Sequence, residues 1–75
     1  MEEYQNLSRD STVRCYEIGV DSITVQFKDN SVYLYTSASA GAEHIKNMKQ
    51  LAAAGRGLYS YIMLNVRKKY SEKLR

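Results

Sequence analysis

One short segment, residues 22–28, constrains the fold of this chain more than any other feature of its sequence. Apolar and polar side chains alternate there without a break, as Ile23, Thr24, Val25, Gln26, Phe27 and Lys28. Successive side chains of a β-strand point to opposite faces, so a period of two predicts a strand with one buried face. We therefore expect a sheet that is covered on one side.

Strands are also predicted before and after this segment. Residues 13–20 are rich in β-branched and aromatic side chains, and polar residues with a glycine mark a turn at residues 19–22. Asp29 and Asn30 tolerate left-handed backbone conformations, and they separate the alternating segment from a third strand over residues 31–36. The three segments predict an antiparallel meander.

The loop between the second and third strands leaves two registers open. A two-residue loop pairs Phe27 with Val32, and Tyr33 and Tyr35 then lie on the outer face of the sheet. A three-residue loop that ends in a left-handed residue pairs Phe27 with Ser31 and turns both tyrosines to the apolar face. We favour the second register, since tyrosine rings bury well when the hydroxyl reaches solvent or a partner. Exposed tyrosines could stack on bases, whereas buried ones would belong to the core.

After residue 36 the period changes to that of helices. A first helix is predicted with Ser37 or Ser39 as its N-cap, and it runs to Ala54, with Gly55 as the residue that ends it. Its apolar side carries Ile45, Met48, Leu51 and Ala52. A second helix is predicted over residues 58–73. Its core stripe consists of Leu58, Ile62, Val66 and Tyr70.

The predicted fold is α+β: a three-stranded antiparallel β-meander followed by two α-helices, in the order β-β-β-α-α, with both helices on the apolar face of the sheet. Residues 1–11 show no period, and we expect them to form a flexible lead-in. Since 75 residues leave room for one small core, residues 12–75 are expected to form a single domain.

One cysteine and one histidine limit the chemistry that this chain can support. Cys15 has no partner for an intramolecular disulfide, and with His44 it cannot complete a four-ligand zinc site. The motifs of serine hydrolases, zinc proteases and phosphate-binding loops are absent from the sequence. We therefore expect no metal, no cofactor and no catalysis, and we interpret His44 as a half-buried residue at the edge of the first helix.

Cys15 is expected to have a structural role. In a regular strand it shares the core face with Val13, while Arg14 and Tyr16 point to the other side. A buried cysteine behaves as a small apolar residue whose thiol resists ionisation.

The sequence contains no apolar run of the roughly 18 residues that a membrane-spanning helix needs, and its first ten residues are acidic and polar. We expect no membrane segment, no secretory signal and no basic transit peptide, and hence a cytoplasmic protein.

Charge is distributed unevenly about a net value of +3. Residues 1–43 hold three Lys or Arg against seven Asp or Glu, whereas residues 44–75 hold eight against one. Such a basic half is typical of a surface that binds the phosphates of nucleic acid, although lysines at a helix end also serve solubility alone.

These features predict a small non-catalytic binding module, with RNA or another nucleic acid as its partner. The residues expected to neutralise phosphates are Arg56, Arg67, Lys68 and Lys69. Those expected to stack on bases are Tyr61 and, if exposed, Tyr33 and Tyr35. The alternative is a protein–protein adaptor or a homodimer that interacts through the second helix, with Tyr61 and Leu64 as anchors and the lysines as a solubilising rim.

Several landmarks also occur together in a known family. They are Ile18 and Gly19 at the end of the first strand, the alternating Ile23, Val25 and Phe27, the pair Tyr33 and Tyr35, the glycine-marked break at residues 55–59, and the late Tyr70. In this order they resemble the KTSC domain, which is found at the C-terminus of some lysyl-tRNA synthetases and as small stand-alone proteins. The resemblance spans roughly residues 11–70 and implies an α+β fold. It also implies RNA binding, drawn from the synthetase context.

Overall fold

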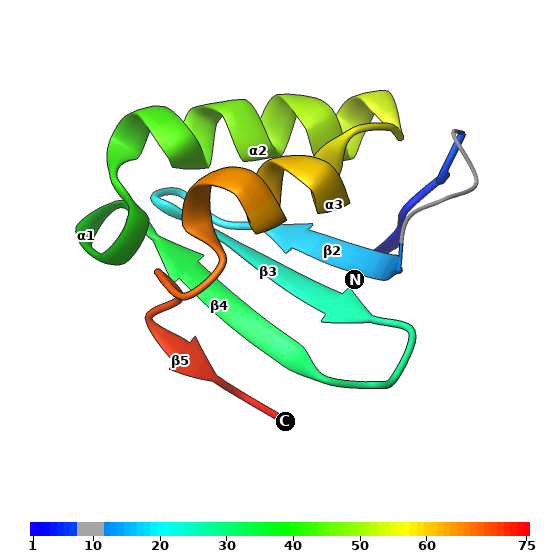
Figure 1. The fold of residues 1–75 in the computed structure, drawn as a ribbon, viewed down its shortest axis with the longest axis horizontal. Coiled ribbons are helices and arrows are strands. Elements are labelled where there is room, and N and C mark those ends of the chain that lie inside the picture. The colour runs from blue at the N-terminus through cyan, green and yellow to red at the C-terminus, as the bar shows by residue number, and fades with distance from the viewer. Residues whose placement is uncertain (8–11) are drawn as a thin grey trace.

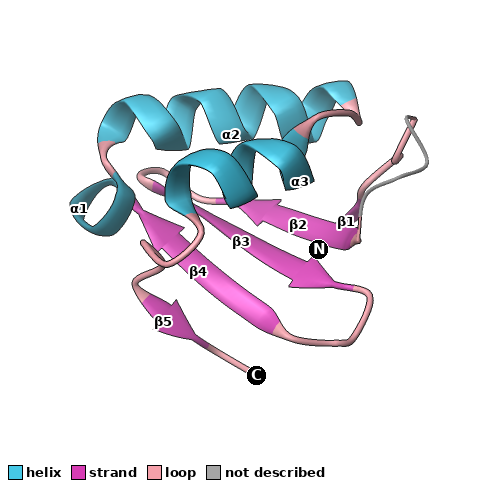
Figure 2. Ribbon diagram, in the orientation of Figure 1, coloured by secondary structure: helices cyan, strands magenta, loops and turns pink. Residues whose placement is uncertain are grey.

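The computed structural model describes residues 1–7 and 12–75. Within these residues, five strands form one antiparallel sheet in sequential order, and helices cover one of its faces (Figures 1 and 2). The strands are β1 (Glu2–Glu3), β2 (Val13–Ile18), β3 (Ser22–Phe27), β4 (Val32–Thr36) and β5 (Glu72–Lys73). The helical elements are α1 (Ser37–Ala40), α2 (Ala42–Ala54), α3 (Leu58–Tyr61) and the π-helical η1 (Ile62–Val66). The predicted α+β class is confirmed.

The alternation in β3 produces the expected two-faced strand. Its apolar side chains Ile23, Val25 and Phe27 are buried, whereas the polar side chains between them are half-buried. They pack against α2, α3 and η1, which lie over this face of the sheet (Figure 1). The most deeply buried aliphatic side chains of the core are Ile23, Val25, Met48, Leu58, Ile62 and Val66.

The hairpin between β3 and β4 has the three-residue loop that we favoured. Val25 pairs with Tyr33, and the amide of Phe27 donates to the carbonyl of Ser31 over 2.9 Å. Asn30 takes the left-handed conformation that this loop requires, with a φ of 73°. The register therefore turns Tyr33 and Tyr35 toward the helices.

The prediction of three strands and two helices is wrong, because two further strands extend the sheet. β1 pairs with β2, and β5 pairs with β4, each over two residues. At the β4 edge, the amides of Ser71 and Leu74 donate to the carbonyls of Leu34 and Val32 over 2.6 and 2.7 Å. Strands of two charged residues show no measurable period, so the sequence pattern does not reveal them.

The N-terminal segment was expected to precede the folded domain, but its described part, residues 1–7, packs into it. Tyr4 is 4% exposed, and its hydroxyl accepts a hydrogen bond of 3.2 Å from the amide of Leu58. The amide of Leu7 donates to the carbonyl of Gly55 over 2.7 Å. The rest of the expected lead-in, residues 8–11, lies outside the described residues.

The first predicted helix is divided at Gly41, whose φ of 102° is not helical. Its N-cap is Thr36 rather than a serine: the Thr36 hydroxyl accepts from the amide of Ser39, and the Ser39 hydroxyl accepts from the amide of Thr36, both over 3.1 Å. The helix ends as predicted, since Gly55 closes α2 with a left-handed φ of 77°.

The second predicted helix ends at Val66 rather than near residue 73. Its core residues recur every four positions. In an α-helix four residues turn through about 400°, so each such residue is rotated by about 40° around the helix axis relative to the one before it. The wider π-helical turn of η1 compensates for this rotation and keeps Val66 fully buried. The Asn65 side chain donates over 3.1 Å to the carbonyl of Tyr61. Tyr70 lies beyond the helix and is 37% exposed, so it does not continue the stripe.

The predicted position of Cys15 is also wrong. The pairing of β2 with β3 shifts between Val13 and Cys15, and such a bulge reverses the alternation of the strand. Tyr16 is therefore buried opposite Val25. Cys15 lies half-buried on the outer face, where its thiol donates over 3.0 Å to Oε1 of Gln26.

Candidate functional site

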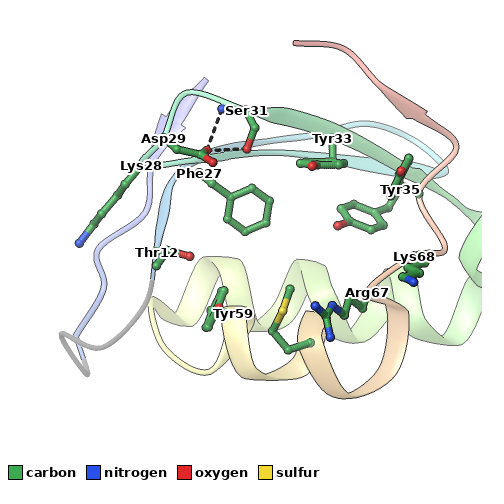
Figure 3. Close-up of a pocket in the computed structure, with 12 residues that line it drawn as sticks. Thr12, Phe27, Lys28, Asp29, Ser31, Tyr33, Tyr35, Tyr59, Arg67 and Lys68 are labelled. Carbon is green, nitrogen blue, oxygen red and sulfur yellow. Dashed lines mark hydrogen bonds between the residues drawn. The ribbon is translucent and has the colours of Figure 1, made fainter.

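A groove with a volume of about 580 Å³ lies between the β3–β4 hairpin and the α3–η1 segment (Figure 3). Its walls are mainly aromatic, and we call it the aromatic groove after Phe27, Tyr33, Tyr35, Tyr59 and Tyr70. Small-molecule sites in proteins have volumes of about 300–1,000 Å³ and walls of this apolar kind.

Two periodicities bring these rings together. Alternation along the strands places Phe27, Tyr33 and Tyr35 on the face that the helices cover. Figure 3 shows Phe27 pointing from the sheet toward the helices and the Tyr33 ring lying beneath its strand. On the opposite wall, Tyr59, Met63 and Arg67 recur every four residues along α3 and η1. The wide turn of η1 keeps positions with this spacing on one side of the helix.

The aromatic rings meet edge to face. The centroid of Tyr33 lies 5.7 Å from that of Phe27 and 4.8 Å from that of Tyr70, with interplanar angles of 77° and 65°. Phe27 and Tyr59 are 6.5 Å apart at 77°. In an edge-to-face pair the edge of one ring covers a face of the other, while the faces of the first ring stay open. Tyr33 and Tyr59 are half-buried and Tyr70 is exposed, so a planar ligand can reach aromatic surface in the groove.

Tyr35 is the most buried ring of the groove, at 2% exposed. Burial raises the pKa of Tyr35 to about 12, and the neighbouring Tyr33 and Tyr70 contribute to the same shift. The hydroxyl is therefore neutral at physiological pH. Tyr35 can contribute a polar group to the groove, but its ring cannot stack on a base.

Cations border the groove. Arg67 and Lys68 are exposed residues of its lining just after η1 (Figure 3). The Nζ atom of Lys73 lies 5.7 Å from the centroid of the Tyr33 ring. Lys28 also lines the groove, although its side chain extends away from the rings (Figure 3). The lining also contains one carboxylate, that of Asp29.

The structure brings four of the seven predicted site residues into this groove: Tyr33, Tyr35, Arg67 and Lys68. Arg56 lies at the corner between α2 and α3 and is not part of the lining, and neither is Lys69. Both remain exposed. The long basic helix that was expected to present these residues together therefore does not form.

Tyr61 holds the two helices together instead of offering a free ring. Its hydroxyl lies 2.6 Å from Nδ1 of His44 and accepts a hydrogen bond of 3.1 Å from Nδ2 of Asn47. The ring meets that of His44 edge to face at 5.6 Å. His44 is half-buried, as predicted. Leu64, the other expected anchor on this helix, is 84% exposed.

Several residues of the groove and its border were not predicted as site residues, among them Asp29, Tyr59, Tyr70 and Lys73. Asp29 reads as an ordinary turn residue. Tyr59 and Tyr70 read as core positions of a long helix. The four-residue spacing of Tyr59, Met63 and Arg67 is the signal that could have placed Tyr59 beside Arg67; no pattern in the sequence points to the other three.

Within residues 1–7 and 12–75, no cluster of three or more His, Cys, Asp or Glu side chains could hold a metal ion. The same residues contain no helix that is both long and apolar enough to span a membrane. The chain matches no protein-family model, no curated protein and no solved structure. Fold and site together define a small α+β protein with an aromatic groove that is bordered by cations.

Proposed function

We propose that this protein is a non-catalytic module that binds single-stranded RNA and takes one unpaired base into the aromatic groove. The observation that carries the proposal is the presence of accessible tyrosine rings and two exposed cations in one lining: Tyr33 and Tyr59 with Arg67 and Lys68. Stacking of a base on an aromatic side chain contributes about 1–3 kcal/mol and tolerates any base.

The shape of the groove favours a single strand over a duplex. Its rings lie between the sheet and the helices, so a base must leave its stack to reach them. Bases of loops and single strands can do this at little cost, whereas those of a helix cannot. The phosphate next to the bound base would then lie against Arg67 and Lys68.

Further positive charge lies on the C-terminal segment. Lys69, Lys73 and Arg75 are exposed, and Lys73 is beside the Tyr33 ring. Such charges attract the phosphate backbone without reading its sequence. The resemblance to the KTSC domain agrees with an RNA partner, and we retain both the family and a cytoplasmic location as predictions.

The adaptor alternative now depends on Leu64. This side chain is 84% exposed on η1, which favours a contact there, but Tyr61 is already bound to His44 and Asn47. Under this alternative, Leu64→Ala abolishes self-association or partner binding, and RNA affinity plays no part.

Fluorescence anisotropy with a short labelled single-stranded RNA of mixed sequence tests the proposal. If Arg67 and Lys68 each neutralise one phosphate, the affinity falls about sevenfold between about 50 and about 200 mM salt. Arg67→Ala should weaken binding and lower the salt slope by about 0.7. Arg56→Ala is the matched control, since Arg56 is also exposed but lies outside the groove. Absence of binding at low salt, or equal effects of the two variants, would contradict the proposal.

A further inference from the structure

A single carboxylate, that of Asp29, lies at the hairpin end of the aromatic groove, whereas Arg67 and Lys68 lie toward its other end (Figure 3). Oδ1 of Asp29 accepts two hydrogen bonds from Ser31: one of 3.0 Å from the amide and one of 2.6 Å from the hydroxyl. Both bonds are drawn in Figure 3. They fix the orientation of the carboxylate in the loop.

These bonds also determine what the carboxylate can still do. Both bonds from Ser31 go to Oδ1, and the amide of Asp29 itself is a further, weaker donor to the carboxylate. The Oδ2 oxygen keeps acceptor capacity for a ligand. The Ser31 hydroxyl, followed by the Ser31 amide, lowers the pKa of Asp29, and the charge of Lys73 makes a smaller contribution. Asp29 is therefore an acceptor without a proton to donate at neutral pH. Lys28, the other nearby cation, points away from the rings (Figure 3).

We infer that Asp29 reads the base in the groove and selects guanine. This inference rests on the proposed function, because it assumes that a base lies on the rings. The Watson–Crick edge of guanine presents two adjacent donors, N1–H and the N2 amino group, which can both donate to the Oδ2 oxygen.

The other bases match less well. Uracil presents one N–H between two carbonyl oxygens, which a carboxylate repels. Adenine and cytosine present one amino group next to a ring nitrogen that is an acceptor. Each of these bases offers a single donor and places an acceptor against the negative carboxylate, so the site discriminates against all three. Hydrogen bonds to two donors of a base discriminate about 5- to 150-fold.

Oligouridines with one central substitution test this inference. The central nucleotide is guanosine, inosine, which lacks the N2 amino group, or uridine, and binding is measured by anisotropy. We expect guanosine to bind about tenfold more tightly than uridine, with inosine between them. Asp29→Asn keeps an oxygen for Ser31 but replaces the free oxygen by a donor, so this preference should disappear. Asp21→Asn, a matched exposed aspartate outside the lining, should retain it.

The outcomes separate this inference from the proposed function. Equal affinity of the wild-type protein for all three oligonucleotides overturns the inference and leaves RNA binding intact. A guanosine preference that persists in a folded Asp29→Asn protein, checked by circular dichroism, also overturns it. If none of the oligonucleotides binds, both the proposed function and the inference fail.

Discussion

The hydroxyl of Tyr4 accepts a hydrogen bond of 3.2 Å from the amide of Leu58, and both residues are buried. This bond ties the N-terminal segment to the first residue of α3. The amide of Leu58 has no intrahelical partner, as is usual for the first residues of a helix, so the tyrosine hydroxyl satisfies it. The wall of the groove that α3 forms therefore depends on a contact with the N-terminal segment.

Tyr4→Phe removes this acceptor and leaves a buried amide unpaired. We expect it to lower the free energy of unfolding by about 1–3 kcal/mol, and the melting temperature by about 4–8 °C for each kcal/mol. Tyr16→Phe is the control: its hydroxyl donates to Glu2 over 3.1 Å, but Glu2 is exposed and water can replace the bond. Equal effects of the two variants in thermal denaturation would show that the Tyr4 hydroxyl has no special role.

Tyr35 makes the protein sensitive to alkaline pH. Burial raises the pKa of Tyr35 to about 12 in the folded protein, from an ordinary value of 10.0. The folded state therefore retains this proton where the unfolded state loses it, so stability is fully present below about pH 10 and falls as the pH rises toward about 12. Chemical denaturation over this range should show the loss, and Tyr35→Phe should reduce it. An identical pH slope in that variant would contradict the assignment.

Cys15 should tolerate substitution better than a core residue. Because the bulge places it on the outer face, Cys15→Ala is expected to change the free energy of unfolding by no more than about 0.5 kcal/mol. Val13→Ala, at a position that is 1% exposed, should cost about 2 kcal/mol. A cost for Cys15→Ala that approaches the Val13 value would place the thiol in the core after all.

The fold was predictable where a pattern extends over several residues. The alternation over residues 22–28 predicted β3 and its buried face. Asn30, which tolerates a left-handed conformation, predicted the three-residue hairpin loop. Gly55 marked the end of α2 because only a residue that tolerates positive φ fits there. Gly41 was a comparable signal, since a glycine inside a helical pattern weakens the helix, and it was overlooked.

The remaining features depend on contacts between distant segments. β1 and β5 are too short to carry a period, and they form because β2 and β4 offer unpaired edges. The bulge near Cys15 leaves no sign in the composition of β2. Part of the groove could not be predicted for the same reason. Tyr70 and Lys73 reach it only because the chain leaves the helix after Val66 and returns to the sheet.

Tyr59 and Tyr61 should differ in what they contribute to binding. Tyr59 lies in the groove, so Tyr59→Ala is expected to reduce affinity for single-stranded RNA about tenfold, the loss of one stacking contact. Tyr61→Phe keeps the ring and loses the bonds to His44 and Asn47, so it should lower stability by about 1 kcal/mol and leave RNA affinity unchanged. The reverse pattern, in anisotropy and denaturation of folded variants, would support the adaptor alternative.

The methionines offer the most direct test of the claim that the aromatic groove binds RNA. Met63 lines the groove, Met48 is fully buried in the core, and Met1 lies outside the groove. With methyl-labelled methionine, titration with a short single-stranded RNA should shift the Met63 resonance strongly, because a base stacked nearby adds its ring current. The resonances of Met48 and Met1 should not shift, and they serve as internal controls. An unchanged Met63 resonance at saturating RNA would contradict the account, and so would a shift confined to Met1.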